Sequence, residues 1–210
     1  GLGFSPDGKT LAAVSIGSNS VTFIDTATNL VRGKVYLGRS PHEAFFTPDG
    51  RELWVAVRGE DYVSVIDPVA MKEKRRITIV NGPGMVLFNP NGRYAYVPSS
   101  FTPELSVIDT RSYRVIAHVR QASPFSPNLA VSPDGRQVWF TLKDSGKTQV
   151  MNALPPFGVT ATLDTGPVTN HVALADTLGG KFAYVTVGGL NVVKVYTRDA
   201  TPKLVASIPT

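Results

Sequence analysis

Phe46-Thr47-Pro48-Asp49-Gly50 is a tight-turn sequence between two apolar stretches, and it recurs along the chain. Equivalent stretches begin at Phe4, Phe88 and Val131, so successive copies start 42, 42 and 43 residues apart, and a degraded fifth copy begins at Ala175. Proline presets φ for such a turn, and glycine supplies the positive φ that the turn needs. The chain is therefore a repeat protein with five visible copies.

A second motif keeps the same spacing. Val65-Ile66-Asp67 has counterparts 42 residues away on either side, at Phe23-Ile24-Asp25 and Val107-Ile108-Asp109. Weaker counterparts follow at Val150-Met151-Asn152 and Val195-Tyr196-Thr197. Two independent motifs in phase over five copies indicate that one structural unit is repeated.

Each copy contains four short apolar runs of the kind that form β-strands. In the second copy they cover residues 43–46, 52–57, 62–66 and 75–80 and are rich in Val, Ile, Tyr, Trp and Phe. Four strands in about 42 residues are typical of a β-propeller blade. We therefore expect an all-β chain, a single β-propeller of four-stranded antiparallel blades at approximately 1–38, 39–80, 81–121, 122–165 and 166–210.

The second strand of each copy is apolar on both faces, as expected for a sheet packed between two others. An aromatic residue recurs in it at Trp54, Tyr96, Trp139 and Tyr184, with Ala12 in the first copy. We interpret these residues as packing between blades and not as stacking partners for a ligand. Because each blade is contiguous, no strand is left to join the first blade to the last, and we expect the chain to be part of a six- or seven-bladed ring.

The composition excludes some site chemistry. The 210 residues contain no cysteine, so disulfides, thiolate metal sites and cysteine nucleophiles are excluded. No apolar run approaches the roughly 18 residues of a membrane span, so no membrane insertion is expected. The net charge of +5 is typical of a soluble protein and also allows weak attraction to polyanions.

The repeat resembles the YVTN-type β-propeller repeat over essentially the whole chain. The resemblance rests on Ala95-Tyr96-Val97, Ala183-Tyr184-Val185-Thr186, Ser106-Val107-Ile108-Asp109-Thr110 and the stretch 24–29. It implies a propeller of an exported protein, periplasmic or extracellular, with relatives among surface-layer propellers, periplasmic binding propellers and haem d1 domains. Two departures, Pro98 and the stretch 151–156, predict local irregularity in the third and fourth blades.

The meander predicts where a site lies. The Pro-Asp-Gly turns and the Ile-Asp turns gather at one end of the blades, the turn end. The loops between strands two and three and between blades gather at the other, the loop end. Loop-end sequences vary from copy to copy, and variable loops on a rigid scaffold are the usual place for binding. The predicted ligand-binding residues, at the loop end and the channel mouth, are His42, Arg58, Asn128 and His171.

His42 and His171 occupy equivalent positions in their copies, which leaves two interpretations open. They are either ligands or an acid–base pair at the channel mouth, or repeat residues that hydrogen-bond a neighbouring blade. A metal site needs three or four ligands, so we predict no metal site and no catalytic residue. His118 and the basic group Lys72, Lys74, Arg75 and Arg76 are expected on outer strands, as surface charges.

These observations favour a non-catalytic scaffold that binds a protein or a polymer such as a glycan across its loop end. Binding of a nucleic-acid strand is a weaker expectation, because the aromatic residues it would need are expected to be buried. The alternative is a propeller domain of an oxidoreductase, with a haem d1-type cofactor or a metal near His42 or His171. Fold cannot decide between the two, since function lies in the site.

Overall fold

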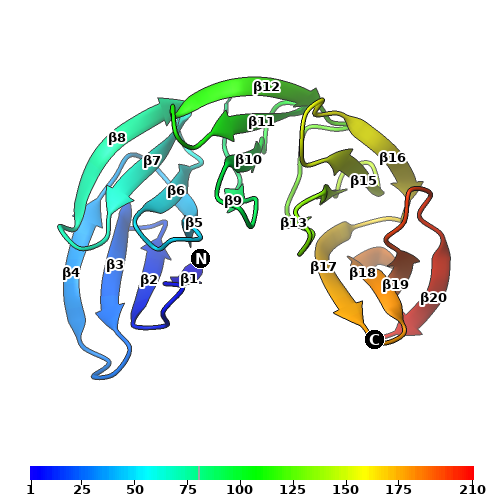
Figure 1. Cartoon of the computed structure of the whole chain (residues 1–210), viewed down its shortest axis with the longest axis horizontal. Coiled ribbons are helices and arrows are strands. Elements are labelled where there is room, and N and C mark those ends of the chain that lie inside the picture. The colour runs from blue at the N-terminus through cyan, green and yellow to red at the C-terminus, as the bar shows by residue number, and fades with distance from the viewer. Residues whose placement is uncertain (80) are drawn as a thin grey trace. The chain divides into compact units, whose positions relative to one another are not determined.

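In the computed structural model, which describes residues 1–79 and 81–210, the chain forms five four-stranded sheets (Figure 1). We call them blades 1 to 5 in chain order. Their strands are β1 (Leu2–Phe4), β2 (Thr10–Ser15), β3 (Ser20–Asp25) and β4 (Val31–Tyr36); β5 (Pro41–Phe46), β6 (Leu53–Val57), β7 (Tyr62–Asp67) and β8 (Lys72–Thr78); β9 (Leu87–Phe88), β10 (Tyr94–Pro98), β11 (Glu104–Asp109) and β12 (Arg114–Arg120); β13 (Leu129–Val131), β14 (Gln137–Leu142), β15 (Lys147–Asn152) and β16 (Val159–Asp164); β17 (Thr169–Thr177), β18 (Gly180–Val187), β19 (Val192–Thr197) and β20 (Leu204–Pro209).

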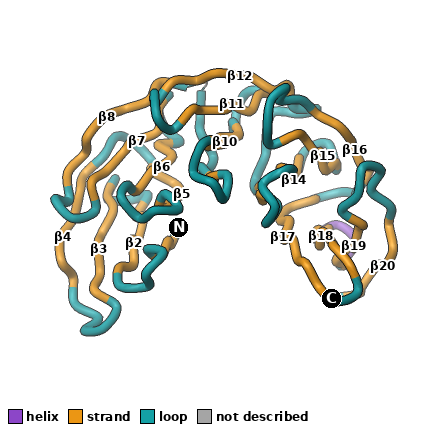
Figure 2. Tube along the Cα trace, viewed as in Figure 1, coloured by secondary structure: helices purple, strands orange, loops and turns teal. Residues whose placement is uncertain are grey.

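Each sheet is a meander in which consecutive strands pair antiparallel. The 3-10 helix Gly188–Leu190 is the one helical segment among the described residues, and loops join the strands elsewhere (Figure 2). The all-β propeller architecture predicted from the repeat is therefore confirmed. A total of six or seven blades stays a prediction. No helix in the described parts of the chain is long and apolar enough to span a membrane.

The chain divides into two compact units. One consists of Gly1–Phe101 with Ser106–Ile116, and the other of Thr102–Leu105 with Ala117–Thr210. Blades 1 and 2 lie wholly in the first unit and blades 4 and 5 wholly in the second, while blade 3 contributes residues to both.

The Pro-Asp-Gly turns hold the first two strands of a blade together by the same bonds each time. In blade 2 the Thr47 hydroxyl donates to Asp49 (Oγ1 to Oδ1, 2.6 Å), and the same carboxylate accepts the Arg51 N–H at 3.1 Å. Gly50 has φ +71°, which residues other than glycine rarely adopt. The matching glycines Gly8 and Gly92 have the same φ and Gly135 has φ +66°, so blades 1 to 4 share this turn.

The aromatic position of the second strand is buried in blades 2 to 4, as predicted, whereas Tyr184 in blade 5 is only half-buried. Trp54, Tyr96 and Trp139 are fully buried. The Trp54 ring meets Phe88 of blade 3 edge to face, with centroids 5.2 Å apart. Its neighbours include apolar side chains of both blades, such as Val65 and Val97. Each sheet thus buries its apolar faces against its neighbours within a unit, which accounts for strands that are apolar on both sides.

In blade 2 the strand limits differ from expectation by one to three residues, most at the outer strand. The outer strand of blade 2 was expected at residues 75–80, but β8 runs from Lys72 to Thr78, and Val80 lies outside the described residues. The strand begins earlier because Lys72 already pairs with Asp67 directly after the turn. Pro98 is the last residue of β10, where its carbonyl accepts the Gly84 N–H at 2.9 Å, so the strand ends there without losing a ladder donor in its middle.

Trp54→Ala tests the packing between blades. Removing a fully buried indole leaves a cavity between blades 2 and 3, so we expect a loss of about 3–5 kcal/mol in the free energy of unfolding. Val69→Ala, at an exposed turn position, is the matched control and should change it by less than about 0.5 kcal/mol. Denaturant unfolding measures both. Similar values for the two variants would contradict this packing.

Candidate functional site

His42 lies at the loop end of blade 2 and bonds to the next blade. Its Nδ1 is 2.8 Å from the carbonyl oxygen of Gly84, which stands 42 positions later. Because a carbonyl oxygen only accepts, Nδ1 carries the proton in this bond. This contact is the one expected if Pro-His is a structural residue of the repeat. It leaves Nε2 as the ring atom for any ligand, so the predicted binding role of His42 stays a prediction.

Arg58 lies at the same loop end. Arg58 directly follows β6, and its backbone N–H donates to the carbonyl of Ser40, two positions before His42. The Arg58 guanidinium carbon lies 5.6 Å from the centroid of the Phe101 ring, a side chain that is 54% exposed. Phe101 is not predicted as a site residue by the sequence, because the repeat does not indicate an exposed aromatic side chain in this loop.

Asn128 and His171 lie together in the second unit. The Asn128 side-chain oxygen accepts the Val172 N–H at 2.9 Å, which ties blade 4 to the start of blade 5. The His171 ring is exposed, and its backbone N–H donates to the Thr186 hydroxyl at 2.8 Å. The structure thus brings the four predicted residues together as two pairs, each within its own unit.

The described residues do not assemble a metal centre. Within residues 1–79 and 81–210, no three His, Cys, Asp or Glu side chains gather closely enough to hold an ion. His118 is on the exposed face of β12 and contacts Glu104, as a surface residue.

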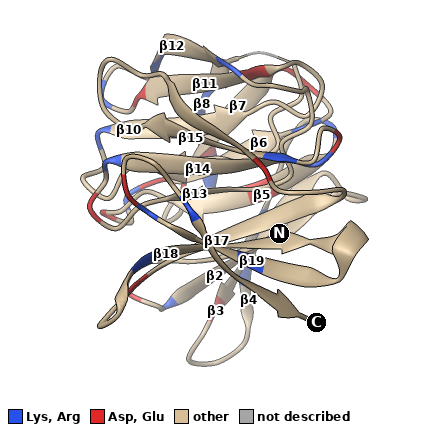
Figure 3. Cartoon of the chain, turned by 90° about the vertical axis from the view of Figure 1, so that its right-hand side faces the viewer, with Lys and Arg blue, Asp and Glu red and all other residues tan. Residues whose placement is uncertain are grey.

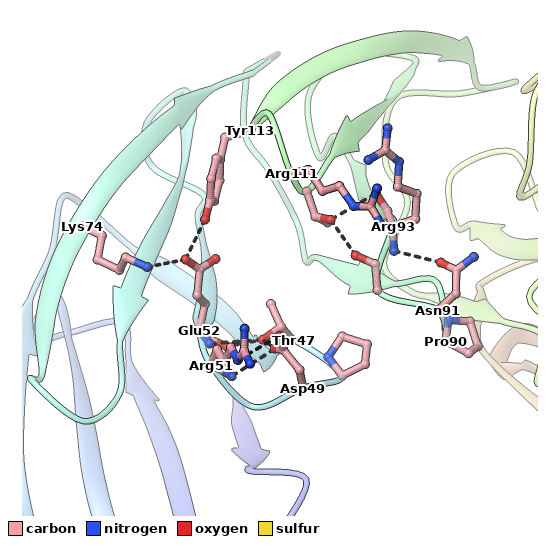
Figure 4. A pocket seen from close by; sticks show the side chains of 13 residues that line it. Thr47, Asp49, Arg51, Glu52, Lys74, Pro90, Asn91, Arg93, Arg111 and Tyr113 are labelled. Atoms are coloured by element: carbon pink, nitrogen blue, oxygen red, sulfur yellow. Dashed lines mark hydrogen bonds and ion pairs between the residues drawn. The ribbon is translucent and has the colours of Figure 1, made fainter.

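The turn end of blades 2 and 3 holds a pocket of ≈ 720 Å³, which we call the turn-end pocket (Figure 4). It lies between the Pro-Asp-Gly turn of blade 2, the Pro-Asn-Gly turn of blade 3 and the turn from β11 to β12. Its lining residues are Thr47, Pro48, Asp49, Arg51, Glu52, Lys74, Pro90, Asn91, Gly92, Arg93, Thr110, Arg111 and Tyr113. All of them belong to the first unit.

Glu52 is the buried hub of this pocket. Its carboxylate accepts hydrogen bonds from Trp54 Nε1 at 2.9 Å, Lys74 Nζ at 2.5 Å and the Tyr113 hydroxyl at 2.8 Å. Figure 4 shows Lys74, from β8, and Tyr113, from the turn between β11 and β12, reaching it. Burial alone would raise the pKa of Glu52, but the bonds from Lys74, Trp54 and Tyr113 outweigh it and lower the pKa below its ordinary value.

The Tyr113 ring has two close neighbours. The Arg75 guanidinium carbon lies 3.9 Å from the ring centroid, and the Trp54 ring lies roughly parallel at 5.9 Å. The hydroxyl is bonded to Glu52. Tyr113 is therefore a wall of the pocket and not a free platform on which a base or sugar ring could stack.

The remaining charges of the pocket are mainly arginines. Arg93 pairs with the buried Asp109 at 2.6 Å, whereas Arg51 reaches Asp49 only at 3.7 Å and is 85% exposed. The guanidinium of Arg111 has no hydrogen bond or ion pair to any described residue, although its backbone N–H donates to Asp109. Elsewhere basic and acidic residues are interspersed along the chain (Figure 3).

Sequence reasoning missed this pocket because it assigned binding to the variable loop end. The turn-end motifs define the repeat, so they do not indicate differences between the copies. The residues that follow these motifs do differ from copy to copy. Arg111 and Tyr113 follow the same Ile-Asp motif that Val69 and Met71 follow one copy earlier, so the two turns differ in charge and shape.

Comparisons with known proteins identify the fold. No protein-family model matches the sequence, and no curated protein matches it. The structure is similar to a hydrazine synthase chain of Kuenenia stuttgartiensis, with a TM-score of 0.81 and 25% identity over 99% of this chain and 65% of that one. It is also similar to a functionally unknown protein of Desulfotomaculum acetoxidans, with a TM-score of 0.84 and 14% identity over 97% of this chain and 68% of that one.

A third similar chain comes from a crystal structure of the mitotic checkpoint complex, with a TM-score of 0.87 and 14% identity over 100% of this chain and 64% of that one. The chain thus spans about two thirds of the length of each neighbour. In all, 1505 solved chains match, so the fold is too widespread to identify a function by itself. The chain is a β-propeller scaffold.

Glu52→Gln tests how much the charge of the Glu52 carboxylate contributes to stability. Gln137 stands at this position in blade 4 and still accepts from Trp139 Nε1 at 3.1 Å, so the substitution keeps the indole bond and removes the charge. We expect a loss of about 1–3 kcal/mol in unfolding free energy at neutral pH.

The pH dependence of the unfolding free energy distinguishes the charge of Glu52 from its packing as the source of this loss. Because folding lowers the pKa of Glu52, its contribution is complete above the ordinary value of 4.5 and is lost as the pH falls through the folded value. The difference between wild type and Glu52→Gln in denaturant unfolding should therefore shrink in acid. A difference that is the same at neutral and acid pH would contradict a charge-based role.

Proposed function

We propose that the protein is a non-catalytic interaction scaffold of the YVTN type, exported to the periplasm or the cell exterior, which binds a protein partner at the loop end of blades 2 and 3. The observation that carries this proposal is Phe101, a large aromatic side chain held half-exposed beside Arg58. The β-propeller fold and its structural neighbours support a scaffold role.

The Phe101 loop is anchored by backbone and hydroxyl bonds. Ser100 N–H donates to the Gly82 carbonyl at 2.7 Å, and the Ser99 hydroxyl donates to Asn81 at 2.5 Å and accepts the Phe101 N–H at 3.1 Å. A Cβ on Gly82 would lie 2.2 Å from the Phe101 ring, so the ring rests directly on the glycine backbone. An exposed ring with so little freedom loses little conformational entropy on binding.

Arg58 is held in the same way. Its backbone N–H donates to the Ser40 carbonyl at 3.1 Å, and Gly59 N–H donates to Arg39 at 3.1 Å. Aromatic residues and arginine are enriched at the centres of protein interfaces, where a few residues contribute most of the binding energy. The pair Phe101 and Arg58 therefore supports a protein as the partner. A propeller in the mitotic checkpoint complex gives a precedent for a chain of this fold in a protein assembly.

A photo-crosslinking amino acid at position 101 tests the proposal. In the native host we expect it to form one discrete crosslinked product, and the same amino acid at the exposed position Leu30 should not. Arg58→Ala should reduce the yield about tenfold or more, as for the loss of a residue at an interface centre. No product at position 101, or the same product at both positions, would contradict a partner at this surface. Fractionation of the same cells tests export.

A second candidate is a propeller domain of an oxidoreductase, favoured by the similarity to a hydrazine synthase chain. An ultraviolet–visible spectrum with metal analysis of the protein purified from its own host distinguishes the two. Our first proposal predicts a colourless protein without stoichiometric metal. Absorbance bands in the visible range that disappear with His42→Ala or His171→Ala would favour the oxidoreductase.

A further inference from the structure

We propose that the turn-end pocket is a binding site for a phosphate group, either free phosphate or a phosphate monoester. The site is separate from the loop-end surface, because it lies at the opposite end of blades 2 and 3 and shares no residue with it. It does not depend on the function proposed above.

The pocket carries an excess of positive charge that its own carboxylates do not neutralise. Its lining contains four cations, Arg51, Lys74, Arg93 and Arg111, and two carboxylates, Asp49 and Glu52, which gives 4 − 2 = +2. Outside the lining, Asp109 pairs with Arg93 and Asp67 acts electrostatically on Lys74, so among the described residues Arg111 is the lining cation whose side chain has no carboxylate partner. Glu52 already accepts three hydrogen bonds, so it has little capacity left for a further cation and does not reach Arg111.

The repeat provides an internal comparison at the junction of blades 1 and 2. Subtracting 42 from each number gives the equivalent residue, so Val69 stands in the place of Arg111 and Thr10 in the place of Glu52. Arg32, the counterpart of Lys74, donates to the Thr10 hydroxyl at 3.2 Å, so a hydroxyl stands in the place of the Glu52 carboxylate. The same scaffold at that junction therefore offers an apolar side chain where the turn-end pocket offers a guanidinium.

At the junction of blades 4 and 5 the residue in the place of Arg111 carries the opposite charge. Asp199 follows the motif residue Thr197 by two positions, as Arg111 follows Asp109, so an acid stands in the place of Arg111. Lys181, the counterpart of Arg93, pairs with Asp134 of blade 4 at 3.2 Å. Nothing in the fold requires an arginine at this turn position, because two other junctions are built without one. We infer that Arg111 serves a ligand and not the packing.

The chemistry of the lining selects the ligand class. Guanidinium groups match the paired oxygens of phosphate, and Asn91 adds an amide at the rim. Tyr113 already packs against Arg75 and Trp54, so it is not a free platform for a base or sugar ring. The volume of ≈ 720 Å³ exceeds what one phosphate needs and leaves room for the group that a monoester carries.

Calorimetric titration with inorganic phosphate and with O-phosphoserine, in chloride buffer, tests the site on the intact protein. We expect saturable binding of at least one probe with a stoichiometry of one. Arg111→Val introduces the residue that blade 2 uses at this position, so the fold should persist, and it should weaken binding about tenfold or more, as for the loss of a charged hydrogen-bonding partner. Arg114→Gln removes a nearby exposed charge outside the pocket and should change affinity less than twofold.

The two probes distinguish the source of the phosphate. Equal affinities indicate free phosphate, and a preference for O-phosphoserine indicates an esterified ligand; both support the site. No saturable binding of either probe would overturn it, and so would an equal loss in Arg111→Val and Arg114→Gln, which would mean diffuse attraction. Phe101→Ala should leave phosphate binding unchanged, so failure of the loop-end proposal and failure of this one can be told apart.

Discussion

Each blade is a four-stranded sheet with two apolar faces, and neither face can be buried by the blade itself. Trp54 shows the consequence, since its indole is buried only because Phe88 and Tyr113 of the next blade cover it. Within a unit this need for neighbours dictates the contacts of the strands and leaves the two ends free to vary. Function is therefore expected at the ends, in residues that packing does not determine.

The turn end of blades 2 and 3 shows how a structural bond network shapes a site. Glu52 binds Trp54 in its own blade and Tyr113 in the next, so the hub that joins the blades also fixes one wall of the pocket. A buried carboxylate with three donors holds its geometry, because losing a donor would leave charge unsatisfied. On the opposite side the guanidinium of Arg111 makes no hydrogen bond or ion pair to a described residue, whereas Arg93 is paired with Asp109.

The repeat spacing was sufficient to predict the blades, their strand order and the burial of Trp54 and Trp139, because in-phase motifs reflect the packing that every copy shares. The site was harder to predict. His42 proved to hydrogen-bond Gly84, one of the two roles its spacing allowed. The sequence did not indicate Phe101 and Arg111 as site residues, because neither belongs to a repeat motif. Whether such a residue is exposed depends on the neighbouring blade, and the sequence of one copy does not show this.

NMR signals of the arginine side chains test the phosphate site at the turn end most directly. In an NMR spectrum of the arginine Nε–Hε groups, titration with inorganic phosphate should shift the signals of Arg51, Arg93 and Arg111 together, with one common saturation curve. The signal of Arg32, at the equivalent junction of blades 1 and 2, should stay in place. Uniform small shifts of all arginines, without saturation, would contradict a built phosphate site at the turn end.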